Sequence, residues 1–212
     1  MDFDFSRLPA NLCYKLLVGL VVPRPIALVT SLGTDGVVNA APFSFFNLMG
    51  DDPPILVISV ERKAGGAVKD TARNILAQQE FVVNLVDEAT ADRMHHCATD
   101  FPSDVSEPAQ VGFTTVASSA IRTPRLAESP VSLECVLYQD IPIGENRRLL
   151  IGRVVWLHCH EGVVDPQTLR VNMNNYFPVG RLYADRYVRS RDQFSVDSSP
   201  DYLASVRTQG RL

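Results

Sequence analysis

The residues that could do chemistry gather near the start of the chain, between Val22 and Asn47. Two apolar β-type runs, Ile26 to Thr30 and Val37 to Phe43, flank a turn at Asp35-Gly36, whose residues tolerate positive φ. The hairpin ends in the sequence PFSFFN at residues 42–47, where aromatic side chains stand beside hydrogen-bonding ones. This combination favours a binding site for a flat polar ligand.

The histidines and a strand glutamate offer weaker alternatives. His158 and His160 lie two apart on an expected strand and share a face that could bind a metal. No acidic residue or further histidine lies at a sequence spacing that indicates a third ligand. His95 and His96 lie on an expected helix, where neighbours diverge by about 100° and cannot chelate one ion together. We interpret Glu134 as part of a solvated or interface face. The sequence therefore predicts no metal ligand and no catalytic side chain.

Several common enzyme motifs are absent from the sequence. It has no G-x-G-x-x-G, no P-loop and no G-x-S-x-G elbow, which argues against a Rossmann dinucleotide site, a phosphate-binding loop and an α/β-hydrolase. The four cysteines form no C-x-x-C pair, so neither a zinc ribbon nor a redox dithiol is indicated. They are Cys13, Cys97, Cys135 and Cys159.

Length and composition indicate one soluble domain. The chain has 212 residues, of which 46% are hydrophobic and 21% charged, enough for a sizeable core. The net charge of −4 argues against binding to nucleic acid or to an anionic membrane. No run reaches the roughly 18 apolar residues of a membrane span. The N-terminus is acidic where a signal peptide would be basic, so we expect a cytoplasmic protein with reduced thiols.

The elements that position the hairpin are mostly strands. We expect a short amphipathic helix over residues 12–20, which ends before Pro23-Arg24-Pro25 because proline disfavours helix in the residue before it. Asp70-Thr71 can cap a second helix that runs to about Gln79, and a third is expected over residues 89–98. Residues 99–130 are expected to be irregular. Further strands are expected at 55–60, 81–86, 131–137 and 149–158.

This count gives about six strands, joined by hairpins or short helices. The regular strand–helix alternation of a doubly wound sheet is missing. We therefore expect a mainly β fold, a closed or nearly closed antiparallel barrel with peripheral helices, because closure removes exposed strand edges.

Eight short pieces of the sequence can be read together in chain order. They are PRPIALVTS at 23–31, NxAPFSFFN at 39–47, DPP at 52–54, KDTxxNI at 69–75, EFVVNL at 80–85, PRLAESP at 124–130, LxIGRVV at 149–155 and VGRL at 179–182. In this order and at this spacing, the sequence resembles the flavin reductase-like family with the FMN-binding split-barrel fold. The resemblance extends roughly from Tyr14 to Phe194 and depends on the order and spacing of the pieces more than on any one of them.

The resemblance implies a six-stranded antiparallel Greek-key split barrel that forms a homodimer, with one FMN per subunit close to the dimer interface. We expect a single domain over residues 1–194, of which 1–22 are a helical lead-in, and a polar tail over 195–212. Small flavin and nicotinamide ligands are the expected partners, without nucleic acid or membrane.

The FMN phosphate needs cationic groups, hydroxyls and free backbone N–H groups. Arg62 and Lys63 on a glycine-containing loop could supply them, together with Thr71 and Asn74 at the start of the following helix. In the alternative interpretation, Asp70 is a plain N-cap that uses those N–H groups and puts a carboxylate where the phosphate should lie. The phosphate would then depend on Arg62, Lys63 and hydroxyls of the hairpin.

The ring and the ribityl chain need other groups. Thr30 and Ser31 could present N–H and hydroxyl groups to the flavin edge on which charge develops during reduction. Ser44 and Asn47 are placed to meet the ribityl hydroxyls, although both residue types also bond to local backbone in turns.

Near the C-terminus, Phe177 and Arg181 resemble the segment that closes over the flavin in relatives, from the same or the other subunit. For Phe177, a place in the core or at an interface is an equal alternative.

Three functions follow from this interpretation. The first is an FMN-dependent oxidoreductase of flavin reductase type, which passes a hydride from NADH or NADPH to bound FMN and on to free flavin or a small acceptor. The second is an FMN-binding electron carrier without nicotinamide turnover. The third is a partner-binding barrel that has lost the flavin.

Overall fold

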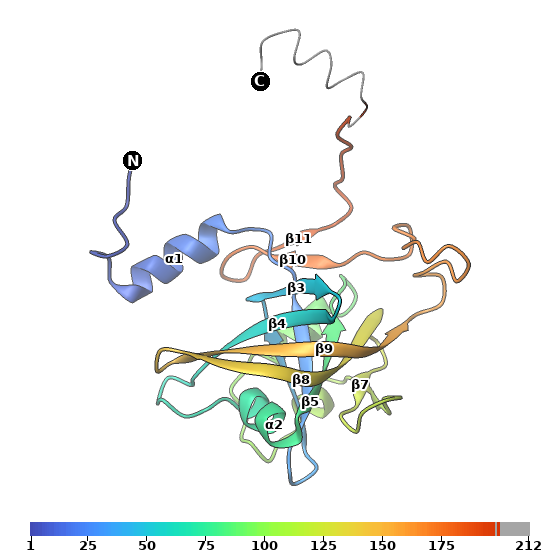
Figure 1. Ribbon diagram of the computed structural model, residues 1–212, viewed down its shortest axis with the longest axis horizontal. Coiled ribbons are helices and arrows are strands. Elements are labelled where there is room, and N and C mark those ends of the chain that lie inside the picture. The colour runs from blue at the N-terminus through green and yellow to red at the C-terminus, as the bar shows by residue number, and fades with distance from the viewer. Residues whose placement is uncertain (198, 200–212) are drawn as a thin grey trace.

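Strands dominate the computed structural model, which describes residues 1–197 and 199 (Figure 1). Seven of them form one antiparallel sheet in the order β2-β1-β5-β8-β9-β4-β3. These are β1 (Ala27–Leu32), β2 (Val38–Phe43), β3 (Phe46–Asp51), β4 (Pro54–Glu61), β5 (Glu80–Leu85), β8 (Val131–Ile143) and β9 (Arg147–Cys159). The expected mainly β fold is confirmed.

The sheet closes on itself through a bent strand. β2 and β3 stand at opposite ends of the strand order, yet only Ser44 and Phe45 separate them in the chain. The Phe45 carbonyl accepts a hydrogen bond of 2.8 Å from the Ser59 backbone N–H, which continues the pairing of β3 with β4 across the bend. The expected six-stranded barrel therefore contains seven strands, because one wall is divided at the bend.

Two hydrophobic clusters lie on opposite sides of β1, which is buried along most of its length. Ala27 and Val29 face the first cluster, which includes Phe81, Ile58 and other side chains of the barrel interior. Leu28 faces the second cluster, which also contains side chains from segments outside the barrel, such as Met94 and Phe113. The alternation of faces along a strand explains how one short strand anchors both clusters.

The helices lie around the barrel, as expected. α1 (Ala10–Leu20) has no buried residue and projects from the barrel in Figure 1, whereas α2 (Asp70–Gln78) packs Ala72 and Ile75 into the first cluster. α3 (Ala91–His96) and α4 (Glu107–Gln110) are short. No helix within residues 1–197 is long and apolar enough to cross a membrane.

Two small sheets of the structure were not predicted from the sequence. β6 (Thr115–Val116) pairs with β7 (Arg125–Leu126) inside the segment 99–130, which also contains α4, so that segment is less irregular than expected. β10 (Val179–Arg181) pairs with β11 (Tyr187–Arg189) near the C-terminus. Of the expected polar tail, residues 195–197 and 199 have no helix or strand, and the rest lies outside the described residues.

The expectation that Asp70 caps α2 is wrong. Lys69 is the N-cap residue, without a side-chain cap, and Asp70 is the first helical residue. Its carboxylate forms ion pairs with Lys63 at 2.8 Å and with Arg73 at 2.5 Å. These two cations lie close enough to hold the carboxylate away from the helix N–H groups.

The interpretation of Glu134 as a solvated or interface residue is also wrong. Its side chain is fully buried and accepts hydrogen bonds from the backbone N–H groups of Ser119 at 2.6 Å and Ala120 at 2.7 Å. His158 Nε2 lies 2.5 Å from the same carboxylate. Three donors compensate the burial of the charge, and they tie the 117–123 loop to the barrel.

Candidate functional site

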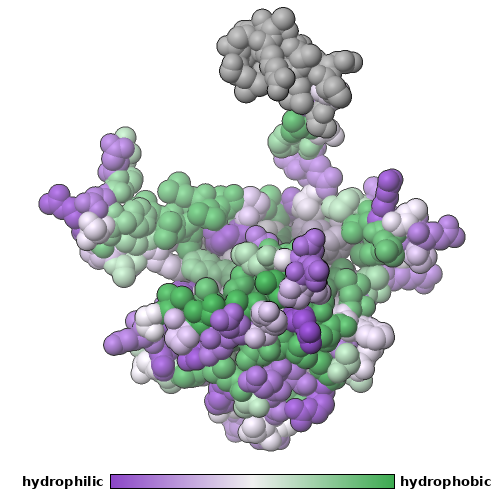
Figure 2. Space-filling view, viewed as in Figure 1, coloured by the Kyte–Doolittle hydropathy of each residue, from purple (hydrophilic) through white to green (hydrophobic). Residues whose placement is uncertain are grey.

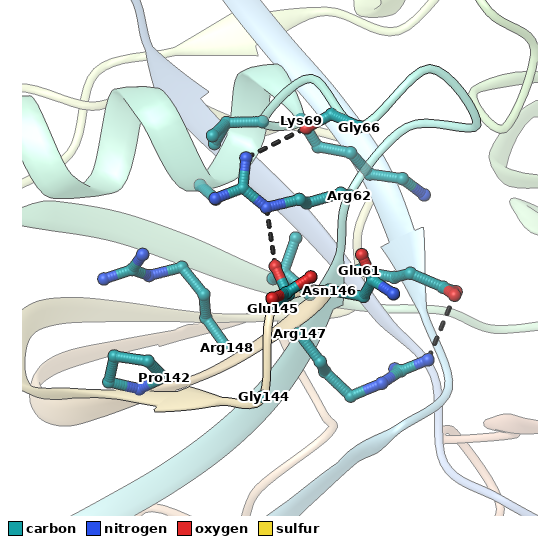
Figure 3. Close-up of a pocket in the computed structure, with 13 residues that line it drawn as sticks. Glu61, Arg62, Gly66, Lys69, Pro142, Gly144, Glu145, Asn146, Arg147 and Arg148 are labelled. Atoms are coloured by element: carbon teal, nitrogen blue, oxygen red, sulfur yellow. Dashed lines mark hydrogen bonds and ion pairs between the residues drawn. The ribbon is translucent and has the colours of Figure 1, made fainter.

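Three adjoining cavities form a continuous groove beside the bend between β2 and β3. The first has a volume of about 490 Å³ and lies between the loop before α2 and the turn that joins β8 to β9 (Figure 3). The second, of about 110 Å³, lies at the bend, and the third, of about 260 Å³, lies beneath α1. The first two share Glu61, Lys69 and Arg147, and the last two share Tyr14, Phe43 and Ser44. We call the whole the site groove.

The first cavity is the basic end of the site groove. Arg147 and Arg148 line it, but each has a carboxylate partner: Glu61 at 3.1 Å for Arg147, and Asp140 for Arg148. Arg62 instead donates to two carbonyls, that of Glu145 from Nε at 2.8 Å and that of Gly66 from Nη1 at 2.9 Å. Figure 3 shows the Arg62 side chain bridging the two loops in this way. Its positive charge therefore has no carboxylate partner within residues 1–197.

Lys69 is the second cation of this cavity without a counter-charge. It is half-buried at the start of α2, lines both the first and the second cavity, and forms no ion pair in the described part of the chain. A partly buried ammonium group without an anion is a typical anion-binding site.

Lys63 has a different environment, because Asp70 neutralises it. Burial alone would raise the pKa of Asp70, but the hydrogen bond from Lys63 and the charge of Arg73 together lower it. Asp70 is therefore ionised at neutral pH, and Lys63 has an occupied partner. The assignment of Lys63 to the phosphate stays a prediction, with Asp70 as a competing partner of the ammonium group.

The bend supplies hydroxyls and rings to the second cavity. The hydroxyl oxygen of Ser44 accepts a hydrogen bond of 3.4 Å from Arg24 Nε, and that of Ser59 accepts one of 3.2 Å from Arg147 Nη1. The centroid of the Phe45 ring lies 6.3 Å from the centroid of the Tyr14 ring. It lies 5.1 Å from the guanidinium carbon of Arg147. A sugar-like chain and the edge of a ring could both contact this surface.

Four predicted residues serve the fold and lie away from the groove: Thr30, Ser31, Thr71 and Asn74 are all buried. The Thr30 hydroxyl donates to the Pro124 carbonyl at 2.7 Å, and the Asn74 amide donates to Ser31 Oγ at 3.3 Å. Thr71 Oγ1 is hydrogen-bonded to the Asn39 amide at 3.0 Å. Ser31, Thr71 and Asn74 connect α2 to β1 and β2, and Thr30 connects β1 to the segment around Pro124. None of the four lines the site groove.

Two other predicted residues, Asn47 and Phe177, do not line the groove either. Asn47 lines another, largely apolar cavity of about 850 Å³, which shares only Arg24 and Ile26 with the third cavity of the groove. Asn47 Oδ1 accepts a hydrogen bond from the Leu48 backbone N–H at 2.9 Å. The guanidinium carbon of Arg191 lies 3.9 Å from the centroid of the Phe177 ring. The site groove therefore brings together Ser44, Arg62 and Arg181 among the ten predicted residues.

Sequence reasoning missed Lys69 and Arg147. Lys69 stands directly before the Asp70-Thr71 pair, at the N-terminus of a helix, where a cation is unfavourable to the helix dipole. That local mismatch was the available signal. Arg147 follows the turn at residues 144–146, and only the pairing of β9 with β4 brings it to Glu61 and the groove.

Comparison with known proteins places this geometry in context. A family model described as "Flavin reductase like domain" matches residues 19–186. The structure of 2-nitrobenzoate 2-nitroreductase NbaA from Pseudomonas fluorescens is 40% identical, with 94% of this chain and 97% of that one covered and a TM-score of 0.87. Nitrilotriacetate monooxygenase component B from Bacillus cereus is 35% identical, with 92% and 98% covered and a TM-score of 0.88. Flavoredoxin of Desulfovibrio vulgaris, at 19% identity, a TM-score of 0.74 and coverage of 95% and 100%, shares the fold.

Proposed function

Because the chain belongs to the flavin reductase-like family, we propose that it is an FMN-dependent oxidoreductase that takes a hydride from NADH or NADPH. The reduced flavin would then serve free flavin or a small acceptor. The two relatives of 35–40% identity carry names with different activities, one a nitroreductase and the other a monooxygenase component, so the acceptor is not carried over from either.

The site groove is the observation that carries the proposal. FMN has a phosphate with close to two negative charges, a hydroxylated chain and a flat ring, and the groove offers groups that match each part. Arg62 and Lys69, which have no carboxylate partner within residues 1–197, line the first cavity. The hydroxyls of Ser44 and Ser59 and the rings of Phe45, Phe43 and Tyr14 line the second. The donor set therefore fits FMN.

Each of these residues has a binding role. Arg62 and Lys69 would hold the phosphate by charge-assisted hydrogen bonds, and Ser44 and Ser59 would meet the ribityl hydroxyls. Arg62 is held in place by its two carbonyl contacts, so little side-chain entropy is lost when it binds an anion. Bound FMN supplies the hydride and electron transfer, and the protein therefore needs no side-chain nucleophile.

The remaining predicted residues have a supporting role in this proposal. Ser31, Thr71 and Asn74 fix α2 against the barrel, and α2 in turn places Lys69 at its N-terminus. Thr30 fixes β1 to the segment around Pro124. A nicotinamide would have to enter the groove from solvent and stack on the exposed flavin face, since the sequence has no Rossmann motif.

An absorption spectrum and an anaerobic titration test the proposal. The purified protein, with FMN added, should show a flavin band near ~450 nm that remains after gel filtration. Stoichiometric NADH or NADPH without oxygen should bleach that band. A protein that retains no flavin rules out both flavin functions. A bound flavin that stays oxidised rules out the reductase and leaves the electron carrier.

We also propose that the protein is a cytoplasmic homodimer. Exposed apolar side chains gather on β3 and β9, among them Leu48, Met49 and Leu157, and the 850 Å³ cavity that Asn47 lines lies beside them. Figure 2 shows hydrophobic surface over the face that β3, β4 and β9 occupy in Figure 1. A second copy of the chain would bury this surface.

A further inference from the structure

The third cavity of the site groove concentrates positive charge at one end of the proposed flavin site. It lies between α1, the end of β2 and the turn from β10 to β11, and its volume is about 260 Å³. No Asp or Glu lines it, and within residues 1–197 neither of its arginines forms an ion pair. Two guanidinium groups and four aromatic rings contribute to its lining: Arg24 and Arg181, with Tyr14, Phe43, Tyr183 and Tyr187.

Arg24 supplies charge to this cavity but few free donors, because the fold uses most of them. Its residue surface is only 8% exposed. It donates to three backbone carbonyls: those of Val18 at 2.7 Å, Val21 at 2.6 Å and Leu182 at 2.6 Å. Burial lowers the pKa of Arg24, and the nearby charge of Arg181 lowers it further. Negative charge in the cavity would stabilise both guanidinium groups.

Arg181 has free donors for such a charge. It donates from Nη1 to the Tyr187 hydroxyl and from Nη2 to the Ala184 carbonyl, and its guanidinium carbon lies 4.7 Å from the centroid of the Tyr187 ring. A guanidinium group has five N–H donors. The Nε–H of Arg181 and a second N–H on each terminal nitrogen have no partner in the described part of the chain. These donors can meet an oxygen or nitrogen atom that gains negative charge.

Tyr187 orients this guanidinium without adding charge of its own. Arginine can only donate, so the Tyr187 oxygen accepts from Arg181. His95 Nδ1 lies 2.9 Å from the same hydroxyl and is the acceptor available for its proton. Burial raises the pKa of Tyr187 above its ordinary value of 10, so the hydroxyl is neutral at pH 7. The charge of Arg181 therefore stays available to a ligand.

The cavity volumes indicate which part of FMN reaches the two arginines. A cavity of about 150 Å³ holds benzene, so the second cavity, of about 110 Å³, is too small to enclose the flavin ring. The third cavity is larger and shares Tyr14, Phe43 and Ser44 with the second. With the phosphate at Arg62 and Lys69, the ring would extend from the second cavity into the third. One edge of the ring would then lie among aromatic walls and beside both guanidinium groups.

Reduction changes the charge of the flavin ring and leaves that of the phosphate unchanged. In the proposed function, a C–H bond of the reduced nicotinamide breaks and its hydrogen is transferred as a hydride to N5 of the flavin, with both electrons of the bond. The nicotinamide is thereby oxidised. The flavin takes up no further proton, and its new negative charge spreads over the N1 and O2 edge. A cation beside this edge therefore stabilises reduced FMN more than oxidised FMN, whereas a cation at the phosphate stabilises both alike.

We infer that Arg181, with the buried charge of Arg24 behind it, faces the N1 and O2 edge of the flavin and raises the reduction potential of bound FMN by stabilising the reduced form. This inference deepens the proposed function and rests on its FMN-binding part. It gives Arg181 a redox role that Arg62 and Lys69 do not share.

Titrations of the full-length protein with oxidised FMN, and with dithionite-reduced FMN in the absence of oxygen, test the inference. Wild type should bind reduced FMN at least about tenfold more tightly than oxidised FMN, which places the midpoint potential of bound FMN about 30 mV or more above that of free FMN. Arg181→Gln should lower this ratio of affinities about tenfold. Tyr187→Phe removes the oxygen that orients Arg181, so it should lower the ratio by less.

Two further variants separate the effect of Arg181 from that of positive charge in general. Arg186→Gln is the matched control, since Arg186 is exposed on the same turn and does not line the cavity. It should keep the ratio of wild type. Lys69→Met should weaken the binding of both forms of FMN and also keep the ratio, because the phosphate has the same charge in both forms.

Equal binding of the two forms by wild type would overturn the inference, and this comparison needs no variant to fold. So would a ratio that Arg181→Gln leaves unchanged, or one that Lys69→Met lowers as much as Arg181→Gln does. A protein that binds neither form loses the proposed function together with the inference. If the ratio behaves as expected but NADH and NADPH leave the bound flavin oxidised, the reductase fails and the role of Arg181 stands.

Discussion

At the scale of single residues, the two lysines near the start of α2 should differ in their effect on FMN. Lys69→Met removes an ammonium group that has no ion pair with any described residue, so the dissociation constant for FMN should rise about tenfold or more. Lys63→Met removes an ammonium group already bonded to Asp70, and Arg73 still neutralises that carboxylate, so the rise should be smaller. Quenching of flavin fluorescence measures both constants. A larger effect from Lys63→Met would refute the assignment of Lys69 to the phosphate.

The sequence revealed the types of the polar residues but not their partners. Thr30 and Thr71 have the side chains that a flavin site needs, and the motifs that contain them resemble the family. In the folded chain, the Thr30 hydroxyl donates to the carbonyl of Pro124, 94 residues away. No local pattern predicts such a contact, because it depends on how β1 meets a distant loop. Ser44 and Arg62 were predictable as groove residues because a bend and a turn expose them.

A second residue, Gly152 on β9, should tolerate no side chain. A Cβ atom there would lie 2.4 Å from Cζ of Phe81 and 3.1 Å from Cβ of Cys135. Gly152→Ala should therefore lower the free energy of unfolding by about 1–3 kcal/mol, through overpacking of the barrel interior. Urea denaturation measures this change. Gly65→Ala is the matched control, since no atom of residues 1–197 lies within 4 Å of the added atom, and it should leave stability nearly unchanged.

At the scale of elements, Glu134 on β8 holds the 117–123 loop, and its removal should loosen that loop. The backbone hydrogen bonds from Ser119 and Ala120 and the contact with His158 lower the pKa of Glu134 below its ordinary value of 4.5, despite burial. A lowered folded pKa means that this stabilisation is complete above 4.5 and is lost as the pH falls through the folded value. Glu134→Gln should lower the free energy of unfolding by about 3 kcal/mol at pH 7. It should also make that free energy fall less steeply as the pH drops below 4.5.

Urea denaturation at pH 7 and at several values below 4.5 measures both effects. Asp165→Asn is a suitable control, because its carboxylate also has a lowered pKa but lies in an exposed turn, bonded to the N–H groups of Gln167 and Thr168. It should change stability much less at pH 7. If Glu134→Gln keeps the acid dependence of wild type, the charge of Glu134 does not hold the loop.

Most elements were predictable from local patterns, with two instructive failures. The alternating or apolar runs that form β1, β4, β5 and β9 were recognised within a few residues of their bounds. β3 was missed because residues 42–47 look like the end of a hairpin, whereas the chain bends at Ser44-Phe45 and pairs again with β4. β10 and β11 were missed because three-residue strands have too few side chains to show a period.

At the scale of the whole molecule, barrel closure was predictable from the count and connection of strands, but its place was not. The order of strands requires the long-range pairings of β1 with β5 and of β4 with β9. These pairings place the bend at Ser44 opposite the loop before α2, and that juxtaposition creates the site groove. The proposed function therefore depends on closure, since the cations and the hydroxyls of the groove come from segments that are distant in the chain.

The same closure leaves one outer face of the barrel apolar, and we expect a second copy of the chain to cover it. Leu48 on β3 is 64% exposed and Leu157 on β9 is 52% exposed. Leu157 is paired in register with Leu133, which lines the 850 Å³ cavity together with Leu48.

Sedimentation should therefore give twice the chain mass of 23.4 kDa. The double variant Leu48→Glu with Leu157→Glu should give the monomer, because charges would be buried without partners. Leu169→Glu, which alters an even more exposed leucine outside this cavity, should remain dimeric. A wild-type chain that sediments as a stable monomer with FMN bound would show that the apolar face has another purpose and that one subunit suffices for the flavin site.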